Sequence, residues 1–125
     1  MDLALDGYCG HPPMLDDAQL MREFICRLAD RIGMTIVNGP TVVSFKEHSG
    51  DPTAGLSAFA IIAESHIALH TWPPQGFIMV DVISCRDFDS LDAINFIKEA
   101  LRLTPTYNRI SERGVPVGIH IRGVP

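Results

Sequence analysis

A polar step between two apolar segments constrains this chain more than any other feature of its sequence. The segments 56–63 and 67–72 are rich in aliphatic residues, and each has the length and composition of a buried strand. Glu64, Ser65 and His66 separate them. Turns between strands ordinarily use Gly, Asn, Asp or Pro, because their backbones tolerate turn geometry. An acid, a hydroxyl and an imidazole at the tip or corner of a hairpin therefore indicate chemistry at this position.

The residues around this step resemble the S-adenosylmethionine decarboxylases of the short prokaryotic type. The resemblance rests on four segments that share the family's order and spacing: Gly55-Leu56-Ser57, Ala63-Glu64-Ser65-His66, Ile67-Ala68-Leu69-His70-Thr71-Trp72-Pro73 and Val80-Asp81-Val82-Ile83-Ser84-Cys85. The specific part covers residues 55–85, and the flanking regions agree in length and in the order of elements. The resemblance predicts a carboxy-lyase of polyamine biosynthesis, the pathway that makes spermidine.

The resemblance also implies that the chain is a proenzyme, or zymogen, that cleaves itself. The Ser65 hydroxyl would attack the carbonyl of Glu64 and convert the peptide bond into an ester, which β-elimination then breaks. Ser65 would become a dehydroalanine, lose its nitrogen as ammonia and remain as a pyruvoyl group. The single domain 1–125 would thus become a β chain, residues 1–64, and an α chain, residues 65–125, with the pyruvoyl group at its N-terminus.

The pyruvoyl group derived from Ser65 would be the cofactor. It forms a Schiff base with a substrate amine, so that the electrons released as carbon dioxide leaves spread into the adjacent carbonyl. The motif match implies three further roles: His70 is the base that drives elimination, Ser57 is a hydroxyl that supports the acyl shift, and Cys85 is the acid that reprotonates the substrate carbon. Trp72 is a candidate substrate contact. Imidazoles and thiols are suited to proton transfer around neutral pH.

Strand geometry adds a constraint on two of these residues. Side chains alternate between the two faces of a strand, so His66 and His70 would share one face while Ser65 points to the other. Bringing His70 to Ser65 requires a bend or bulge where Glu64 meets Ser65. The sequence therefore predicts an irregular strand at this step.

Two positions depart from the family pattern. The family continues His-Thr-Trp-Pro with a Glu that is expected to hold the ribose hydroxyls of S-adenosylmethionine, whereas this chain has Pro74. The family also places an aromatic residue shortly before Gly55, where it stacks on adenine, but the nearest upstream aromatic residue here is Phe45. The family's default substrate is S-adenosylmethionine, and L-ornithine or L-arginine is the alternative, because each presents an α-amine next to a carboxylate.

The composition fits a small cationic substrate of the amino-acid type. The chain has a formal net charge of -5, and its ten Lys and Arg residues are scattered, which argues against a nucleic-acid partner. The cationic tail of ornithine or arginine would need an acidic pocket, for which Asp6, Glu47 and Asp51 are candidates. A chain of 125 residues is small enough that we expect a homodimer, or a higher homo-oligomer of processed protomers, to complete the site.

The location is expected to be cytoplasmic. The N-terminus has no basic region followed by a long apolar core, and no apolar run reaches the roughly 18 residues needed to cross a bilayer, so no membrane partner is expected. Cys9, Cys26 and Cys85 form an odd set without Cys-x-x-Cys spacing, which indicates neither a disulfide framework nor a structural zinc site. Reduced thiols are therefore expected.

The element pattern predicts an α+β fold, a two-layer α/β sandwich whose largely antiparallel sheet is covered by helices on one face. Besides the two strands of the hairpin, strands are expected over 3–8, 34–45, 77–84, 106–110 and 117–121. The turn residues 38–40 would divide the second of these into a hairpin or mark a bulge. One helix is expected between a cap at Asp16 and Gly33, and another between a cap at Asp89 or Ser90 and Pro105.

Two other functions fit parts of the pattern. An uncleaved paralogue of the same fold would keep the hairpin and regulate an active relative. A zinc-binding β domain would use His66 and His70, which share a strand face, together with His48 or His120. Nothing in the Cys or His spacing supports a zinc site, so no metal is predicted, and the retained reactive residues favour self-processing over the regulatory alternative.

Overall fold

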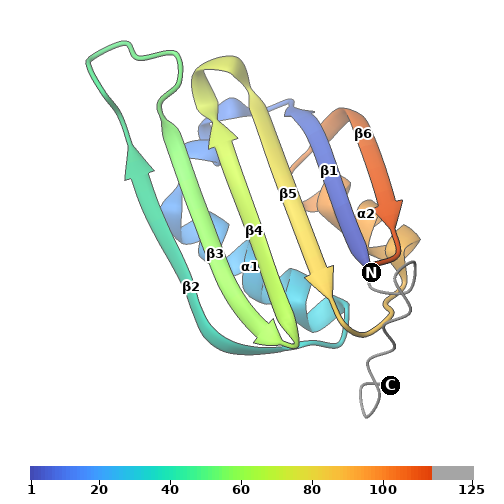
Figure 1. The fold of residues 1–125 in the computed structure, drawn as a ribbon. Coiled ribbons are helices and arrows are strands. Elements are labelled where there is room, and N and C mark those ends of the chain that lie inside the picture. Colours follow the sequence, from blue (N-terminus) through green and yellow to red (C-terminus); the bar gives the residue numbers. More distant parts are fainter. Residues whose placement is uncertain (114–125) are drawn as a thin grey trace.

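The structure, a computed structural model, describes residues 1–113 of the chain. Within these residues an antiparallel six-stranded sheet has the strand order β2-β3-β4-β5-β1-β6. Its strands are β1 (Asp2–Cys9), β2 (Thr35–Phe45), β3 (Gly55–Ala63), β4 (Ser65–Trp72), β5 (Phe77–Ser84) and β6 (Leu103–Ser111). The helices α1 (Ala18–Arg31) and α2 (Ser90–Ala100) cover one face of the sheet (Figure 1). The predicted α+β sandwich is confirmed.

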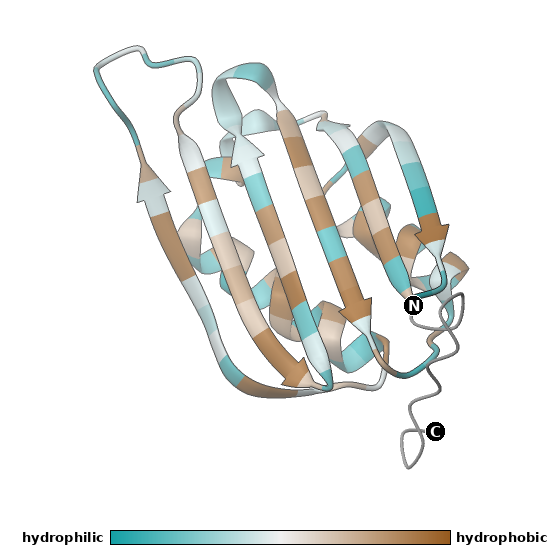
Figure 2. Cartoon of the chain, in the orientation of Figure 1, coloured by the Kyte–Doolittle hydropathy of each residue, from teal (hydrophilic) through white to brown (hydrophobic). Residues whose placement is uncertain are grey.

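The core lies between the sheet and the two helices. Alternation along the strands directs one set of side chains toward the helices and the other set toward the opposite face, which we call the open face. In β4, for example, Ile67 and Leu69 are fully buried whereas His70 is exposed. Figure 2 shows the polar residues as teal bands between brown apolar ones along β1 and β4. The open face carries Ser57 and His70, two of the predicted catalytic residues.

Both helices begin at an aspartate cap. The Asp17 carboxylate accepts a hydrogen bond from the Leu20 N–H at 3.0 Å, so the predicted cap at Asp16 is wrong by one residue. Asp16 instead ends a short 3-10 helix, η1 (Pro12–Asp16), which brings the chain to α1. Asp89 caps α2 in the same way, through the Asp92 N–H at 3.0 Å.

The strand β2 continues through the predicted turn. Its pairing with β3 shifts register on both sides of Asn38, so the turn residues 38–40 mark an irregularity within one strand and do not divide it into a hairpin. The last strand, β6, starts three residues earlier than predicted, at Leu103. The strand expected over 117–121 lies outside the described residues.

Among residues 1–113, neither helix has the length and apolar character required to cross a membrane.

Candidate active site

The polar step lies at the tip of a tight hairpin. β3 and β4 pair in antiparallel fashion up to the pair Ile62 and Ser65, so Ala63 and Glu64 alone make the connection. β4 begins at Ser65, two residues earlier than the sequence predicts, and Ser65 also pairs with Ser84 of β5. The predicted position of the step at a hairpin tip is confirmed.

Ser65 has a strained backbone and a sulfur neighbour. Its φ is 111°, in a region that residues with a side chain rarely adopt and that is enriched at functional sites. Its Oγ lies 3.6 Å from the Sγ of Cys85, within hydrogen-bond distance for sulfur. Both residues are half-buried, Ser65 at the start of β4 and Cys85 directly after the end of β5. The structure thus brings together a hydroxyl nucleophile and a thiol that can exchange a proton with it.

Cys85 also contacts the carbonyl that Ser65 would attack. The backbone N–H of Cys85 donates a long hydrogen bond, 3.4 Å, to the carbonyl oxygen of Glu64. A backbone N–H directed at a carbonyl oxygen stabilises the negative charge that develops there during nucleophilic attack. The sequence analysis missed this contact, because it depends on the main chain after β5 and leaves no trace in residue type.

Ser57 and His70 form a second pair, on the open face. They are direct partners in the pairing of β3 with β4, and the Ser57 Oγ lies 3.0 Å from the His70 Nδ1. Both side chains are exposed, and they line a hollow of about 390 Å³ together with Thr41, Val43, Ala58, Phe59 and Ala68. A hydroxyl hydrogen-bonded to an imidazole is suited to acid–base chemistry on a molecule that enters this hollow.

Within one chain the structure keeps these two pairs apart. The β3–β4 ladder runs without a register shift from the pair Ser57 and His70 to the pair Ile62 and Ser65. His70 therefore lies five residues along β4 from Ser65, or roughly 16 Å at about 3.3 Å per residue. The backbone is irregular at Ser65, as predicted, but the predicted bend or bulge that would bring His70 to Ser65 is absent from the single chain. The physical reason is that β4 is hydrogen-bonded to a neighbour on each side, so a bulge would break two ladders.

Trp72 lies at the far end of β4 from Ser65. Its ring is half-buried, with its centroid 6.4 Å from that of His70 and 5.5 Å from that of Phe77. The short 3-10 helix η2 (Pro73–Gln75) follows directly and contains Pro74. The structure thus places Trp72 with the Ser57 and His70 pair and away from Cys85.

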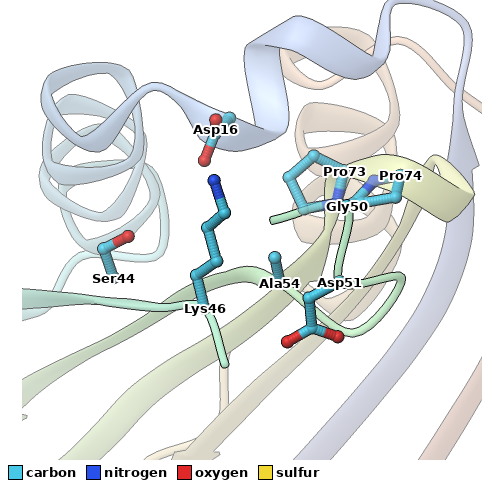
Figure 3. A pocket seen from close by; sticks show the side chains of 8 residues that line it. All are labelled: Asp16, Ser44, Lys46, Gly50, Asp51, Ala54, Pro73 and Pro74. Carbon is cyan, nitrogen blue, oxygen red and sulfur yellow. The ribbon is translucent and has the colours of Figure 1, made fainter. Parts of the chain in front are cut away.

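Pro74 borders a hollow of about 320 Å³ between η1, η2 and the loop that joins β2 to β3 (Figure 3). Lys46 points its ammonium group toward the Asp16 carboxylate across this hollow, while the Asp51 side chain points away (Figure 3). The side chain of Pro74 has no oxygen that could accept hydrogen bonds from ribose hydroxyls.

Asp51, a predicted candidate for the substrate's cationic tail, is committed to its own loop. The buried carboxylate accepts hydrogen bonds from the Glu47 N–H at 2.9 Å, the Thr53 hydroxyl at 2.7 Å and the Thr53 N–H at 2.8 Å. These bonds, led by the one from Glu47, lower the pKa of Asp51 to about 2. Asp51 therefore orders residues 46–54 and does not face a ligand. Glu47 is exposed on the same loop, and Asp6 lies on β1.

Among the described residues, no group of three or more His, Cys, Asp or Glu side chains could hold a metal ion. The His66 ring packs against Phe59 at 5.2 Å, and the His48 Nδ1 lies 3.0 Å from the carbonyl of Ser49. His120, the other candidate ligand, lies outside the described residues.

The three cysteines are unpaired. Cys9 is buried, and its thiol donates to the Leu101 carbonyl at 3.1 Å, which gives it a structural role. Cys26 is exposed on α1. Cys85 alone among the three lies beside a predicted reactive residue.

Comparison with known proteins covers all of the described residues. The sequence pattern of one family, S-adenosylmethionine decarboxylase, matches residues 1–114. The chain belongs to this family. It is therefore a decarboxylase-family protein, and the carboxy-lyase predicted from the hairpin motif is confirmed.

Relatives among the S-adenosylmethionine decarboxylases support the assignment along the full length. The S-adenosylmethionine decarboxylase proenzyme of Parasynechococcus marenigrum (strain WH8102) is 34% identical over 116 residues, which cover 92% of this chain and 85% of the relative. The proenzyme of Acidithiobacillus ferrooxidans (strain ATCC 53993 / BNL-5-31) is 34% identical over 124 residues, covering 98% and 86%. The crystal structure of the adenosylmethionine decarboxylase from Aquifex aeolicus VF5 shares the fold, with a TM-score of 0.72, 24% identity and coverage of 90% and 88%.

Proposed function

We propose that this decarboxylase is a self-processing, pyruvoyl-dependent enzyme of cytoplasmic polyamine biosynthesis that is cleaved between Glu64 and Ser65. The contacts of Cys85 carry the proposal: its thiol lies 3.6 Å from the Ser65 hydroxyl, and its N–H donates to the Glu64 carbonyl at 3.4 Å. The nucleophile, the carbonyl and a hydrogen-bond donor for the developing oxyanion thus meet at one strained turn.

The cleavage is a rearrangement of the chain itself followed by hydrolysis. The Ser65 Oγ adds to the Glu64 carbonyl carbon and the Ser65 nitrogen leaves, which converts the amide into an ester with a free amine. Removal of the Ser65 α-proton then expels Glu64 as a carboxylate and leaves a dehydroalanine. Its imine tautomer takes up one water and releases ammonia. The chain thus divides into 1–64 and 65–125, and the new N-terminus of the second fragment is a ketone.

The residues around Ser65 fit a pyruvoyl group at this position. Once formed, the group supplies an electron sink for decarboxylation of an α-amino acid. Cys85 lies beside the position that the ketone would occupy, and its thiol is placed to return a proton to the substrate carbon. The half-buried setting limits the access of water to this end of β5.

We further propose that the active site is completed in a homodimer, by the open face of a second copy. The separation of Ser65 from His70 along β4 supports this arrangement, because a base must approach the Ser65 α-carbon and His70 of the same chain lies roughly 16 Å away. The open face also exposes large apolar side chains, Phe59 and Met79 among them, that a second sheet would cover.

The substrate of the family, S-adenosylmethionine, is the first candidate, and L-ornithine or L-arginine is the second. The residue at position 74 favours the second, since the Pro74 side chain offers ribose hydroxyls no acceptor in place of the carboxylate of the family pattern. Release of labelled carbon dioxide from each compound by the processed enzyme separates the two. If none of the three compounds is decarboxylated, the metabolic assignment fails.

The first experiment is the intact mass of the denatured protein beside that of Ser65→Ala. We expect two fragments that meet between Glu64 and residue 65, the second without a free N-terminal amine, and one uncut chain in the variant. A single species of 13.7 kDa from the unaltered chain would refute self-processing. The uncleaved, regulatory paralogue would then be the better description.

Mixing two inactive variants tests the homodimer. Ser65→Ala cannot be cut but retains His70, whereas His70→Ala retains the cleavage site but lacks the base. If His70 acts on the partner's Ser65, mixed dimers will cleave the His70→Ala chain, and the mass of that fragment identifies it. Cleavage that stays absent in the mixture, although both variants associate in light scattering, would place His70 outside the partner's site.

A further inference from the structure

A second hollow on the open face combines a carboxylate with three aromatic rings. It has a volume of about 150 Å³ and lies where β1, β5 and β6 meet. Its lining includes Asp6, Tyr8, Phe77 and Tyr107. None of these residues belongs to the pairs formed by Ser65 with Cys85 or Ser57 with His70.

The strand register assembles this hollow. Tyr8 of β1 is the direct partner of Phe77 of β5, and Asp6 of β1 is the direct partner of Tyr107 of β6. The Tyr8 and Phe77 ring centroids lie 5.3 Å apart. Tyr8 is 51% exposed and Tyr107 is 61% exposed. Rings this exposed contribute little to the core of one chain and can contact a ligand or the second copy proposed above.

The charge of the hollow is not neutralised within the described chain. The ion pairs of residues 1–113 join Arg31 to Asp92 and Arg113 to Asp2, and neither uses Asp6. The Arg109 guanidinium lies 5.5 Å from the centre of the Tyr107 ring, so this ring already holds a cation of the chain itself, with which a ligand cation would compete. The sequence offers three acids for a cationic tail. Asp51 accepts hydrogen bonds from its own loop, and Glu47 is exposed on that loop. Of the three, only Asp6 lines an aromatic hollow.

We propose that this hollow binds the cationic end of the substrate and selects an ammonium or guanidinium group. Aromatic faces attract any organic cation, including a sulfonium. A carboxylate adds short, charge-assisted hydrogen bonds only when the cation carries N–H donors. The pairing of Asp6 with Tyr8 and Tyr107 therefore favours a basic amino acid over a sulfonium compound.

A row of rings connects this hollow with the Ser57 and His70 pair. Ring centroids are separated by 6.4 Å from His70 to Trp72, by 5.5 Å from Trp72 to Phe77 and by 5.3 Å from Phe77 to Tyr8. The use of this row by a substrate rests on the proposed function, in which His70 of one copy lies at the Ser65 end of a second copy. A substrate whose α-amine reacts there would lay its side chain along the rings toward Asp6.

Binding to the uncut Ser65→Ala protein tests the site without any need for catalysis. Isothermal titration with agmatine, which carries a guanidinium and an ammonium, is compared with titration with S-adenosylmethionine. We expect Asp6→Asn to lower the affinity for agmatine at least about tenfold, since it removes a charge-assisted hydrogen bond. The affinity for S-adenosylmethionine should stay within about twofold of the parent value. Tyr107→Leu should weaken agmatine as well. The matched control is Asp81→Asn, an exposed carboxylate of β5 outside the hollow, which should leave both affinities unchanged.

The outcomes separate this inference from the proposed function. Agmatine that does not bind, or that binds Asp6→Asn as tightly as the parent protein, overturns the inference even if the processed enzyme is active. Agmatine binding that depends on Asp6 supports the site even if no substrate is decarboxylated. In an active enzyme, Asp6→Asn should raise KM for the basic amino acid far more than it lowers kcat, and an unchanged KM would overturn the assignment.

Discussion

Thr71 links three segments that position the Ser57 and His70 pair, and its removal gives a stability change that can be worked out from the structure. Its side chain is buried, and its Oγ1 donates to the Leu15 carbonyl at 2.7 Å and accepts from the Leu56 N–H at 2.9 Å. Thr71→Val keeps the shape of the side chain but leaves both buried backbone groups without their partner. An unpaired buried group costs about 1–3 kcal/mol, so the loss of a partner for two groups should lower the free energy of unfolding by roughly 2–6 kcal/mol.

Thr71→Ser is the matched control, because it keeps the hydroxyl and loses one methyl group, worth about 1 kcal/mol. Both variants are compared by urea unfolding in the Ser65→Ala background, where the chain stays whole. The midpoint should fall much further for Thr71→Val than for Thr71→Ser. Equal midpoints would refute the reasoning, because the two hydrogen bonds would then contribute no more to stability than the one methyl group.

Three further predictions concern the same scaffold. Gly55→Ala should destabilise the fold by more than about 2 kcal/mol, because a Cβ there would lie 1.8 Å from the Thr71 carbonyl oxygen, and a thermal midpoint close to that of the parent would contradict this close approach. Asp51, whose pKa is about 2 in the fold, stabilises its loop above about pH 4, near the ordinary value of an aspartate. The contribution of the Asp51 carboxylate to stability is lost as the pH falls from about 4 toward 2. The difference in unfolding midpoint between the parent and Asp51→Asn should therefore shrink over that range. A difference that stays constant would refute this role of Asp51. Arg86→Met should leave the free energy of unfolding unchanged or raise it by about 1 kcal/mol, because the Arg86 Nε is buried and has no hydrogen-bond partner among residues 1–113. A clear loss of stability in urea unfolding would reveal a partner for this guanidinium.

The elements of the fold were accessible from sequence because they follow from local patterns. Segments with the length and apolar composition of strands predicted β1, β3, β4 and β5 to within a few residues, and aspartates marked the start of both helices. The error at the first helix, Asp16 in place of Asp17, arose because two adjacent aspartates satisfy the same capping rule. Only the preceding 3-10 helix decides between them.

The geometry of the site was not accessible in the same way, because distances between strands depend on register. The motif put Ser57, Ser65, His70 and Cys85 into one set by resemblance. The register divides that set into two pairs at opposite ends of β4. Likewise, residue type alone could not distinguish Asp6 from Asp51, since loop hydrogen bonds occupy one carboxylate and leave the other beside a hollow.

The position of β4 in the sheet explains why one chain would hold two half-sites. β4 is paired with β3 over residues 65–70 and with β5 over its whole length, so this part of the strand can neither bend nor slip without breaking two ladders. Strain is therefore confined to its first residue, Ser65, where cleavage is proposed. The same rigidity holds His70 and Trp72 at a set distance from that residue. Two copies packed in opposite directions through their open faces would join the Ser65 end of each chain with the His70 end of the other, which makes two complete sites from one rigid strand.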